Sequence, residues 1–300
     1  MRIGTLQLFR QGVNAILDQQ TRVAGTQLQL ASGKRINNPS DDPIGAAQLV
    51  GLSESLKVTE QYQKNIDHAR SRLELEDAAL GSVGNALQRA RELAVQGLND
   101  TNGAQDRAAI AQEIRQLTDE VLGLANRKDG AGEYLFAGFQ GQNAPFSHDG
   151  SGNFSYAGDQ GQRQVQVGPA RQVADGDSGL DVFMKVPAAG GGFEDVFSTL
   201  YKLATDLEAN APNAGSLDQI DAAMDHLLGF RATAGARLNA IDSQATINGA
   251  LLEQLNATRS NIEDIDYAEA ASRLSQQSVT LQAAQQAFVR VQNLNLFNFL

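Results

Sequence analysis

The stretch 30-LASGKRINNPSDDPIGAAQ-48 interrupts two segments that both carry helical patterns. A glycine such as the one at position 33 commonly ends a helix, and the Asn-Asn-Pro sequence after it does not continue one easily. An aspartate directly before a proline is typical of a helix N-cap and its first turn. The stretch therefore predicts a break between two helices, with hinge and cap roles for Pro39, Asp41, Asp42 and Pro43.

The two adjacent aspartates also allow a second interpretation, which is a calcium site or a catalytic carboxylate pair. Such a site needs further oxygen ligands or a partner for proton transfer. No further acid or histidine sits nearby in the sequence to complete it. Capping is therefore the favoured interpretation of Asp41 and Asp42.

Both ends of the chain carry apolar residues in a heptad pattern, which is typical of helices that pack against partner helices. At the N-terminal end the pattern comprises Leu6, Phe9, Val13, Ile16, Val23 and Leu30, with Gln20 and Gln27 on the same seam. At the C-terminal end it comprises Tyr267, Leu274, Leu281 and Phe288, with Gln277, Ala284 and Val291 beside them. Both ends are predicted to be coiled-coil helices that seek partners.

The two ends differ in charge. Residues 1–36 contain five basic residues and one acid, whereas residues 253–300 contain five acids and three arginines. Opposite charges favour pairing of the ends, although an exposed ion pair contributes only about 0–1 kcal/mol. The apolar seams are therefore expected to supply most of the association.

Helical spacing also dominates the middle of the chain. One helix is predicted from about residue 44 to 98, a second ends before Asp129, and helical spacing resumes after residue 193. Ser216 and Gln219 are placed as a capping box, after which the pattern continues with little interruption almost to the C-terminus. The fold class predicted is mainly α, a long helical coiled-coil bundle formed by the N- and C-terminal segments.

The helical period is lost from about residue 140 to 192, where polar and apolar residues alternate among many glycines. This texture predicts a small β domain inserted in the middle of the chain. Because it offers few apolar residues to the helices, we expect it to pack separately. The predicted domains are terminal coiled coil (1–38 with 262–300), helical shaft (39–139 with 194–261) and inserted β domain (140–193).

Known signatures of catalysis and metal binding are lacking. His68, His148 and His226 stand far apart in the sequence without metal-ligand spacing, and the chain has no cysteine. The Asp175–Asp181 segment starts like a calcium loop but has Leu180 and Val186 where the loop needs a glycine and an acid. We expect no enzyme activity, no catalytic residue, no metal site and no cofactor.

The bulk composition narrows the classes of partner. A formal net charge of -11 without a basic patch argues against nucleic-acid binding. No apolar run is long enough to cross a membrane, and the first residues lack the apolar core and cleavage site of a secretory signal. If the protein leaves the cell, we expect a route without a cleaved signal peptide.

Three stretches closely resemble the ends of the bacterial flagellin superfamily. They are LASGKRINNPSDDPIGAAQ, LQRARELAVQGLND, and the C-terminal DYAEAASRLSQQSVTLQAAQQAFVRVQNLNLFNFL. With the helices between them they cover about two thirds of the chain. Three further features are more similar to the hook-filament junction members than to flagellin itself: the start MRIGT, the segment EYLFAGFQ at 133–140, and the aromatic ending LNLFNFL. Gly4 and Phe299 are small departures from the commonest residues there.

The resemblance implies a structural junction protein of the flagellum, exported unfolded through the flagellar type III apparatus. It implies that the terminal seams form the assembly interface, with hook-associated protein 1, flagellin, copies of the same chain and an export chaperone as partners. Two alternatives stay open: a flagellin-type filament subunit, and a secreted coiled-coil adhesin whose β insertion binds a ligand.

Overall fold

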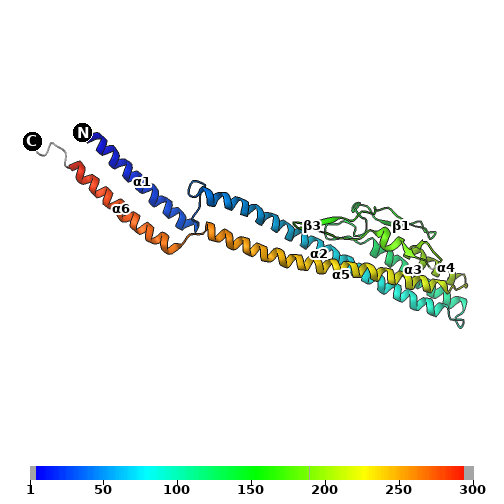
Figure 1. The fold of residues 1–300 in the computed structure, drawn as a ribbon. Coiled ribbons are helices and arrows are strands. Elements are labelled where there is room, and N and C mark those ends of the chain that lie inside the picture. Colours follow the sequence, from blue (N-terminus) through cyan, green and yellow to red (C-terminus); the bar gives the residue numbers. More distant parts are fainter. Residues whose placement is uncertain (1–4, 189, 294–300) are drawn as a thin grey trace, which may run out of the picture. The chain divides into compact units, whose positions relative to one another are not determined.

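The computed structural model describes residues 5–188 and 190–293. Its long helices are α1 (Thr5–Ser32), α2 (Pro43–Gly97), α3 (Ala104–Ala125), α4 (Val196–Glu208), α5 (Gly215–Glu263) and α6 (Tyr267–Asn293) (Figure 1). The strands are β1 (Phe146–His148), β2 (Phe154–Tyr156), β3 (Gln164–Gly168), β4 (Arg171–Ala174), β5 (Val186–Pro187) and β6 (Phe193–Glu194), with a π-helical turn, η1 (Leu180–Met184), before β5. The predicted class is confirmed: long helices at both ends and a small β region between them.

The chain divides into two compact units, residues 1–58 with 251–300 and residues 59–250. The first unit contains α1, α6 and the adjoining ends of α2 and α5. The second contains the remainder of α2 and α5, together with α3, α4 and all the strands. This boundary crosses the two longest helices, whereas the sequence placed domain boundaries at residues 38 and 262.

In the second unit, α2 buries a seam that follows the heptad rule for nearly its whole length. The buried seam residues are Ile66, Ala69, Leu73, Glu76, Leu80, Val83, Leu87, Ala90 and Ala94. On α5 the matching residues recur every seventh position: Ile220, Leu227, Ala234, Ile241 and Asn248. Such spacing lets two helices keep the same faces together over many turns.

The β region consists of three separate two-stranded antiparallel hairpins, β1-β2, β3-β4 and β5-β6. In the first hairpin Phe146 pairs with Tyr156, and the second has an irregularity between Gln166 and Gly168. No larger sheet forms among the described residues, so the hairpins depend on the helices for their core.

Aromatic rings carry that shared core. Phe197 of α4 lies with its ring centroid 5.2 Å from Phe146, 5.3 Å from Phe154 and 5.7 Å from Phe183, and Phe183 meets Phe136 edge-on at 5.1 Å. These rings belong to the same cluster as the part of the α2 seam from Leu80 to Ala94. The expectation of a separately packed β domain is wrong, because the hairpins contribute their large apolar residues to the helical core.

Two local predictions also differ from the structure. The helix predicted to start with a capping box at Ser216 begins one residue earlier, at Gly215, whose N–H donates to Asn213 Oδ1 at 3.0 Å. Gln219 is buried inside the first turns instead of capping them. The C-terminal helical pattern is broken between Glu263 and Tyr267, where Asp266 accepts the N–H groups that start α6.

Candidate assembly interface

The joint between α1 and α2 begins at Gly33, which directly follows the last residue of α1. Gly33 has φ +73° and its N–H donates to Gln29 O at 2.9 Å, the left-handed ending that glycine adopts at low cost. A Cβ at this position would lie 2.9 Å from Tyr267 Oη. Glycine is therefore required here both by the backbone conformation and by the neighbouring tyrosine.

Two linkers, residues 33–42 between α1 and α2 and residues 264–266 between α5 and α6, are joined by main-chain hydrogen bonds. Lys34 and Asp264 form an antiparallel bridge, flanked by Arg35 N–H to Glu263 O at 2.6 Å and Ile265 N–H to Gly33 O at 3.0 Å. The side chain of Lys34 also pairs with Glu263. The chain therefore passes through the joint twice, once on each side of the bridge.

Asp42 occupies the N-cap position of α2. Its Oδ1 accepts the N–H of Gly45 at 2.9 Å, and its Oδ2 lies 3.2 Å from the Arg35 guanidinium. The Gly45 N–H, and secondarily Arg35, hold the pKa of Asp42 below its ordinary value of 3.8. The carboxylate thus satisfies a backbone donor that the helix cannot satisfy internally.

Asp41 acts on the linker itself. Its Oδ2 accepts the N–H groups of Asn37 at 3.1 Å and Asn38 at 2.9 Å, which fixes the turn before α2. Gly45 then lets the linker pack closely, because a Cβ there would lie 2.6 Å from Ile36 Cδ1. Ile36 is buried. The joint therefore has a small core of its own.

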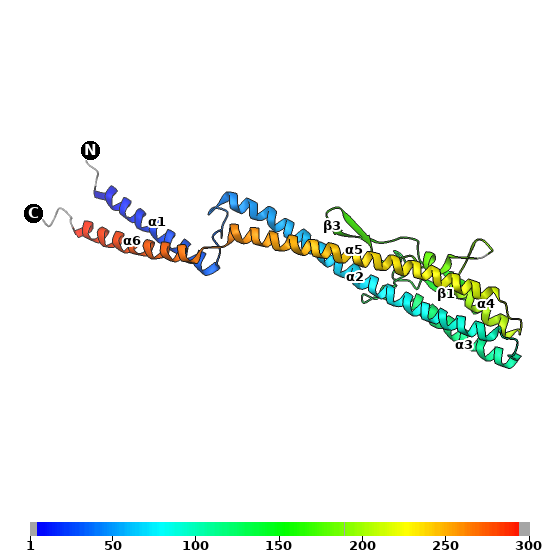
Figure 2. The ribbon, with the colours of Figure 1, turned by 60° about the horizontal axis from the view of Figure 1, so that its bottom comes forward.

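Helices α1 and α6 lie side by side within this unit (Figures 1 and 2). The rings of Phe9 and Phe288 are 5.2 Å apart, and a Cβ at Gly12 would lie 2.8 Å from Phe288 Cδ2. The two predicted seams thus face each other in a single chain. Opposing seams supply the packing that each helix lacks alone.

A polar contact crosses this helix pair. Thr26 is buried and its Oγ1 donates to Gln277 Oε1 at 2.9 Å, while Gln19 Nε2 donates to Gln277 O at 3.1 Å. Sequence reasoning placed Gln277 on the seam but did not identify Thr26 as its partner. A polar pair at one level of an apolar seam penalises shifted registers, which leave its groups unpaired.

The structure places the predicted interface residues in two classes. Half-buried ones lie along the facing seams: Val13, Ile16, Val23, Leu30, Leu274, Leu281 and Phe288. Phe9 and Tyr267 are exposed. The side chains of Leu6 and Val291 fall outside the described residues, as do residues 1–4 and 294–300, which carry two of the similarities to junction proteins.

Further apolar residues point away from the seams. Leu17 and Leu28 on α1 are 53% and 52% exposed, and Val279 and Val289 on α6 are 64% and 54% exposed. Their positions do not fit the heptad seams, so the heptad pattern did not predict them as interface residues. The signal available in the sequence was their apolar character at positions where an isolated pair needs polar residues. The α1-α6 pair therefore still offers apolar surface on other faces.

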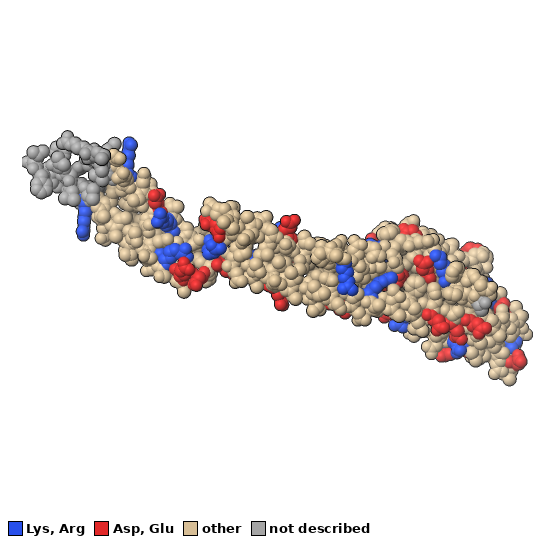
Figure 3. Space-filling view, in the orientation of Figure 1, with Lys and Arg blue, Asp and Glu red and all other residues tan. Residues whose placement is uncertain are grey.

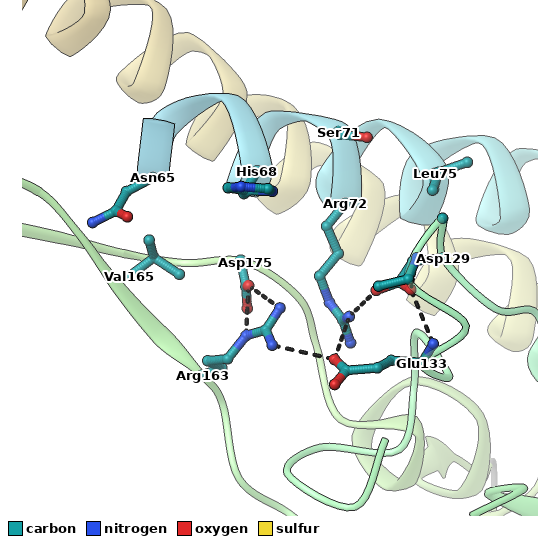
Figure 4. Close-up of a pocket in the computed structure, with 12 residues that line it drawn as sticks. Asn65, His68, Ser71, Arg72, Leu75, Asp129, Glu133, Arg163, Val165 and Asp175 are labelled. Carbon is teal, nitrogen blue, oxygen red and sulfur yellow. Dashed lines mark hydrogen bonds and ion pairs between the residues drawn. The ribbon is translucent and has the colours of Figure 1, made fainter. Parts of the chain in front are cut away.

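The described part of the chain also contains a pocket in the second unit (Figure 4). It measures about 660 Å³ and lies between α2, the loop at residues 129–133 and the β3-β4 hairpin. Arg72 donates to Asp129 Oδ2 at 2.6 Å, and Arg163 Nε donates to Asp175 Oδ2 at 2.7 Å. Each arginine is therefore already paired with a carboxylate. The Arg72–Asp129 pair fixes the loop at residues 129–133 to α2, and the Arg163–Asp175 pair joins the two ends of the β3-β4 hairpin.

The three histidines do not meet in this pocket. His68 lines it, whereas His148 Nδ1 accepts the Gly150 N–H at 3.2 Å and His226 Nε2 lies 2.8 Å from Asp181 O. Within residues 5–188 and 190–293, no group of three or more His, Asp or Glu side chains is placed to hold a metal ion. His148 and His226 thus make structural contacts with the backbone.

Two surface properties complete the description. On the face shown in Figure 3, acidic and basic side chains are interspersed, without a broad basic patch. None of the described helices is both long enough and apolar enough to span a membrane. The α1-α6 pair thus exposes apolar side chains on its outer faces, and Ile44 on α2 and Phe139 and Phe193 in the second unit are exposed as well.

Comparison with known proteins identifies similar chains. The model for the bacterial flagellin N-terminal helical region matches residues 3–141, and that for the bacterial flagellin C-terminal helical region matches residues 217–300. Flagellar hook-associated protein 3 of Escherichia coli K12 is 31% identical over 99% of this chain and 99% of its own length.

Solved structures agree with this similarity. FlgL of Xanthomonas campestris is 26% identical, with a TM-score of 0.58 over 69% of this chain and 99% of that one. The flagellar junction protein FlgL of Legionella pneumophila has a TM-score of 0.60, over 72% of this chain and 100% of that one, at 23% identity. The latter similarity shows the shared fold.

Proposed function

We propose, from the premise that this chain belongs to the flagellar hook-associated protein 3 family, that it is a structural junction protein of the bacterial flagellum. In this role it joins the hook-side hook-associated protein 1 to the flagellin filament. The full-length similarity to the Escherichia coli protein supports the proposal. The Legionella relative with the same fold is described as a flagellar junction protein.

The structural observation that carries the proposal is the α1-α6 pair. Its facing seams hold the two ends of one chain together, while Leu17 and Val279 leave apolar side chains on outward faces. Burial of such side chains against neighbours contributes roughly 25 cal/mol for each Å² removed from water. The pair is therefore suited to packing beside equivalent pairs in copies of this chain, in hook-associated protein 1 and in flagellin.

The proposed role requires no catalysis, cofactor or metal ion. The joint residues Pro39, Asp41, Asp42 and Pro43 serve as hinge and helix cap. The protein acts outside the cell, at the hook-filament junction. It reaches that place through the flagellar export apparatus, without a cleaved signal peptide and with the help of an export chaperone.

The test is the phenotype of a strain that lacks the protein. We expect cells that carry hooks without filaments and that release flagellin monomers into the medium, with motility restored by the intact chain. A deletion strain that keeps attached, full-length filaments would exclude the junction role. Flagellin secretion in that strain should be measured as well, because its loss would indicate an export defect instead.

Two further measurements separate the alternatives. A filament subunit should polymerise alone into long filaments after purification, whereas a junction protein should not. An adhesin should capture a glycan or protein ligand through residues 140–192. The intact chain must be used for that binding assay, because these residues share their core with the helices.

A further inference from the structure

A layer of charged residues interrupts the seam between α2 and α5. Glu76 is 1% exposed and lies seven residues after Ala69 and seven before Val83, both buried and apolar. On α5, Arg237 lies fourteen residues, or two heptads, after the buried Ala223 and therefore on the same face of the helix. One apolar cluster ends at Ala79 and Leu227 and the other at Leu73 and Ala234. The charged layer lies between these two clusters.

The segment 175–179 enters this layer from the β region. Arg237 donates two hydrogen bonds to the Asp177 carboxylate, at 2.9 and 3.0 Å, and Gln162 donates a third at 2.6 Å. The Asp177 N–H in turn donates to Glu76 Oε1 at 3.0 Å. The segment is thus attached to α5 through its side chain and to α2 through its backbone.

The second oxygen of Glu76 has a different environment. Among the described residues, Oε2 is buried without a hydrogen-bond partner. A Cβ at Gly176 would lie 3.8 Å from it, so the backbone of the segment covers the carboxyl group. A buried carboxylate oxygen without a donor is costly, whereas a neutral carboxyl group is much less so.

Among the described residues Glu76 forms no ion pair, although Arg72 Nε is itself buried without a hydrogen-bond partner. Arg237 is occupied by Asp177, and Arg72, on the same helix as Glu76, is bound by Asp129 and approached by Glu133. The remaining charged neighbours on the β side, Asp175 and Arg163, pair with each other. Burial and then the Asp177 charge raise the pKa of Glu76 to about 8, and the hydrogen bond from the Asp177 N–H, followed by the charges of Arg237 and Arg72, offsets this only in part.

We propose that Glu76 is a proton-dependent clamp, which holds segment 175–179 between α2 and α5 while its carboxyl group is neutral. Loss of the proton places a second negative charge beside Asp177, and Glu76 has no ion pair of its own to offset it. The segment, followed directly by the η1 turn, is then expected to separate from α2. The clamp couples the attachment of the β region to pH.

The direction of the pH dependence follows from the two states of the carboxyl group. The closed structure keeps the proton up to about pH 8, whereas an exposed glutamate loses it near 4.5. The closed state therefore binds more protons between these values, and its stability is greatest below pH 4.5 and falls as pH rises to 8. The opening equilibrium should increase up to about tenfold per pH unit in this window.

The first experiment measures the proton directly. Side-chain carboxyl carbons are observed by NMR in carbon-13-labelled intact protein, with Glu76→Gln used to assign the signal. We expect the Glu76 carboxyl to titrate near pH 8. Titration in the ordinary range near 4.5 would overturn the proposal even if the variant failed to fold, because this measurement uses the wild-type chain.

The second experiment measures the clamp. Hydrogen exchange of the backbone amides in residues 175–184 is followed at pH 5 and 7 and corrected for the intrinsic pH dependence of exchange. Wild-type protection should fall up to about a hundredfold between these values, whereas Glu76→Gln should change little. Glu74→Gln, an exposed acid on the same helix, is the matched control and should behave as wild type. Equal pH dependence in wild type and Glu76→Gln would exclude the clamp.

Discussion

Substitutions at Leu281 and Val279 should separate the contacts within one chain from the contacts between chains. Both residues are aliphatic and lie two positions apart on α6, but Leu281 is half-buried in the seam with α1 and Val279 is 64% exposed. Replacing each with aspartate introduces the same charge on two different faces. We expect Leu281→Asp to loosen the α1-α6 pair and Val279→Asp to leave it intact.

The expected magnitude follows from burial. Full burial of a leucine side chain is worth about 1.5–3 kcal/mol, so a half-buried one loses about 1 kcal/mol. Placing a carboxylate in a partly apolar seam adds about 1–3 kcal/mol. The sum, about 2–4 kcal/mol, is a large fraction of the stability that a two-helix contact can supply. At Val279 both contributions should be small, because the side chain is mostly in water.

The assays are limited proteolysis of the purified chains and motility of the deletion strain carrying each variant. Leu281→Asp should be trimmed rapidly at both ends, to a core near residues 39–261, and should fail to restore motility. Val279→Asp should resist proteolysis like wild type and still fail to restore motility, because we propose that its exposed face packs against other subunits. Full motility with Val279→Asp would show that this face is not an interface. Wild-type protease resistance in Leu281→Asp would refute the seam argument.

Three further predictions concern the joint and the β region. Gly45→Ala should destabilise the start of α2, since the new methyl group would collide with Ile36. Thermal unfolding should show a lower melting temperature than for the control variant Gly51→Ala, whose methyl group meets no neighbouring atom. Equal melting temperatures of the two variants would contradict this. Asp42→Ala should increase hydrogen exchange at the Gly45 amide. In wild type this amide should lose its protection only as pH falls below 3.8 through the lowered pKa of Asp42. Unchanged exchange in the variant would show that Asp42 does not protect this amide. Deleting residues 140–192 should yield insoluble protein instead of a soluble shaft, because Phe197 loses three aromatic neighbours. Burial of one phenylalanine side chain contributes about 1.5–3 kcal/mol to stability. A soluble deletion variant that restores motility would show that the core tolerates this loss.

The sequence predicted the helices well because a period of seven persists over many turns. The break after Gly33 and the cap position of Asp42 were recognisable because few residue types satisfy a helix end. Local signals failed where tertiary contacts decided the outcome. The Ser216 capping box was a correct motif in the wrong context, since the helix starts at Gly215.

The packing of the β region could not be inferred from its composition. Its polar residues outnumber its aromatic ones, but Phe146 and Phe183 lie in the same core as α4. Which residues meet across distant segments is decided by the tertiary fold, and a single sequence carries no direct record of it. Glu76 was not identified from the sequence, although its seven-residue spacing from Ala69 and Val83 places it at a seam position.

The paired linkers at the joint have a mechanical consequence. A single linker would let the bodies on its two sides swivel about its backbone bonds. Here two linkers run side by side and are tied by the hydrogen bonds Arg35 to Glu263 and Ile265 to Gly33, so twisting must break these bonds whereas bending across the bridge can preserve them. In a junction that passes rotation from hook to filament, such a joint would yield to curvature and still transmit torque.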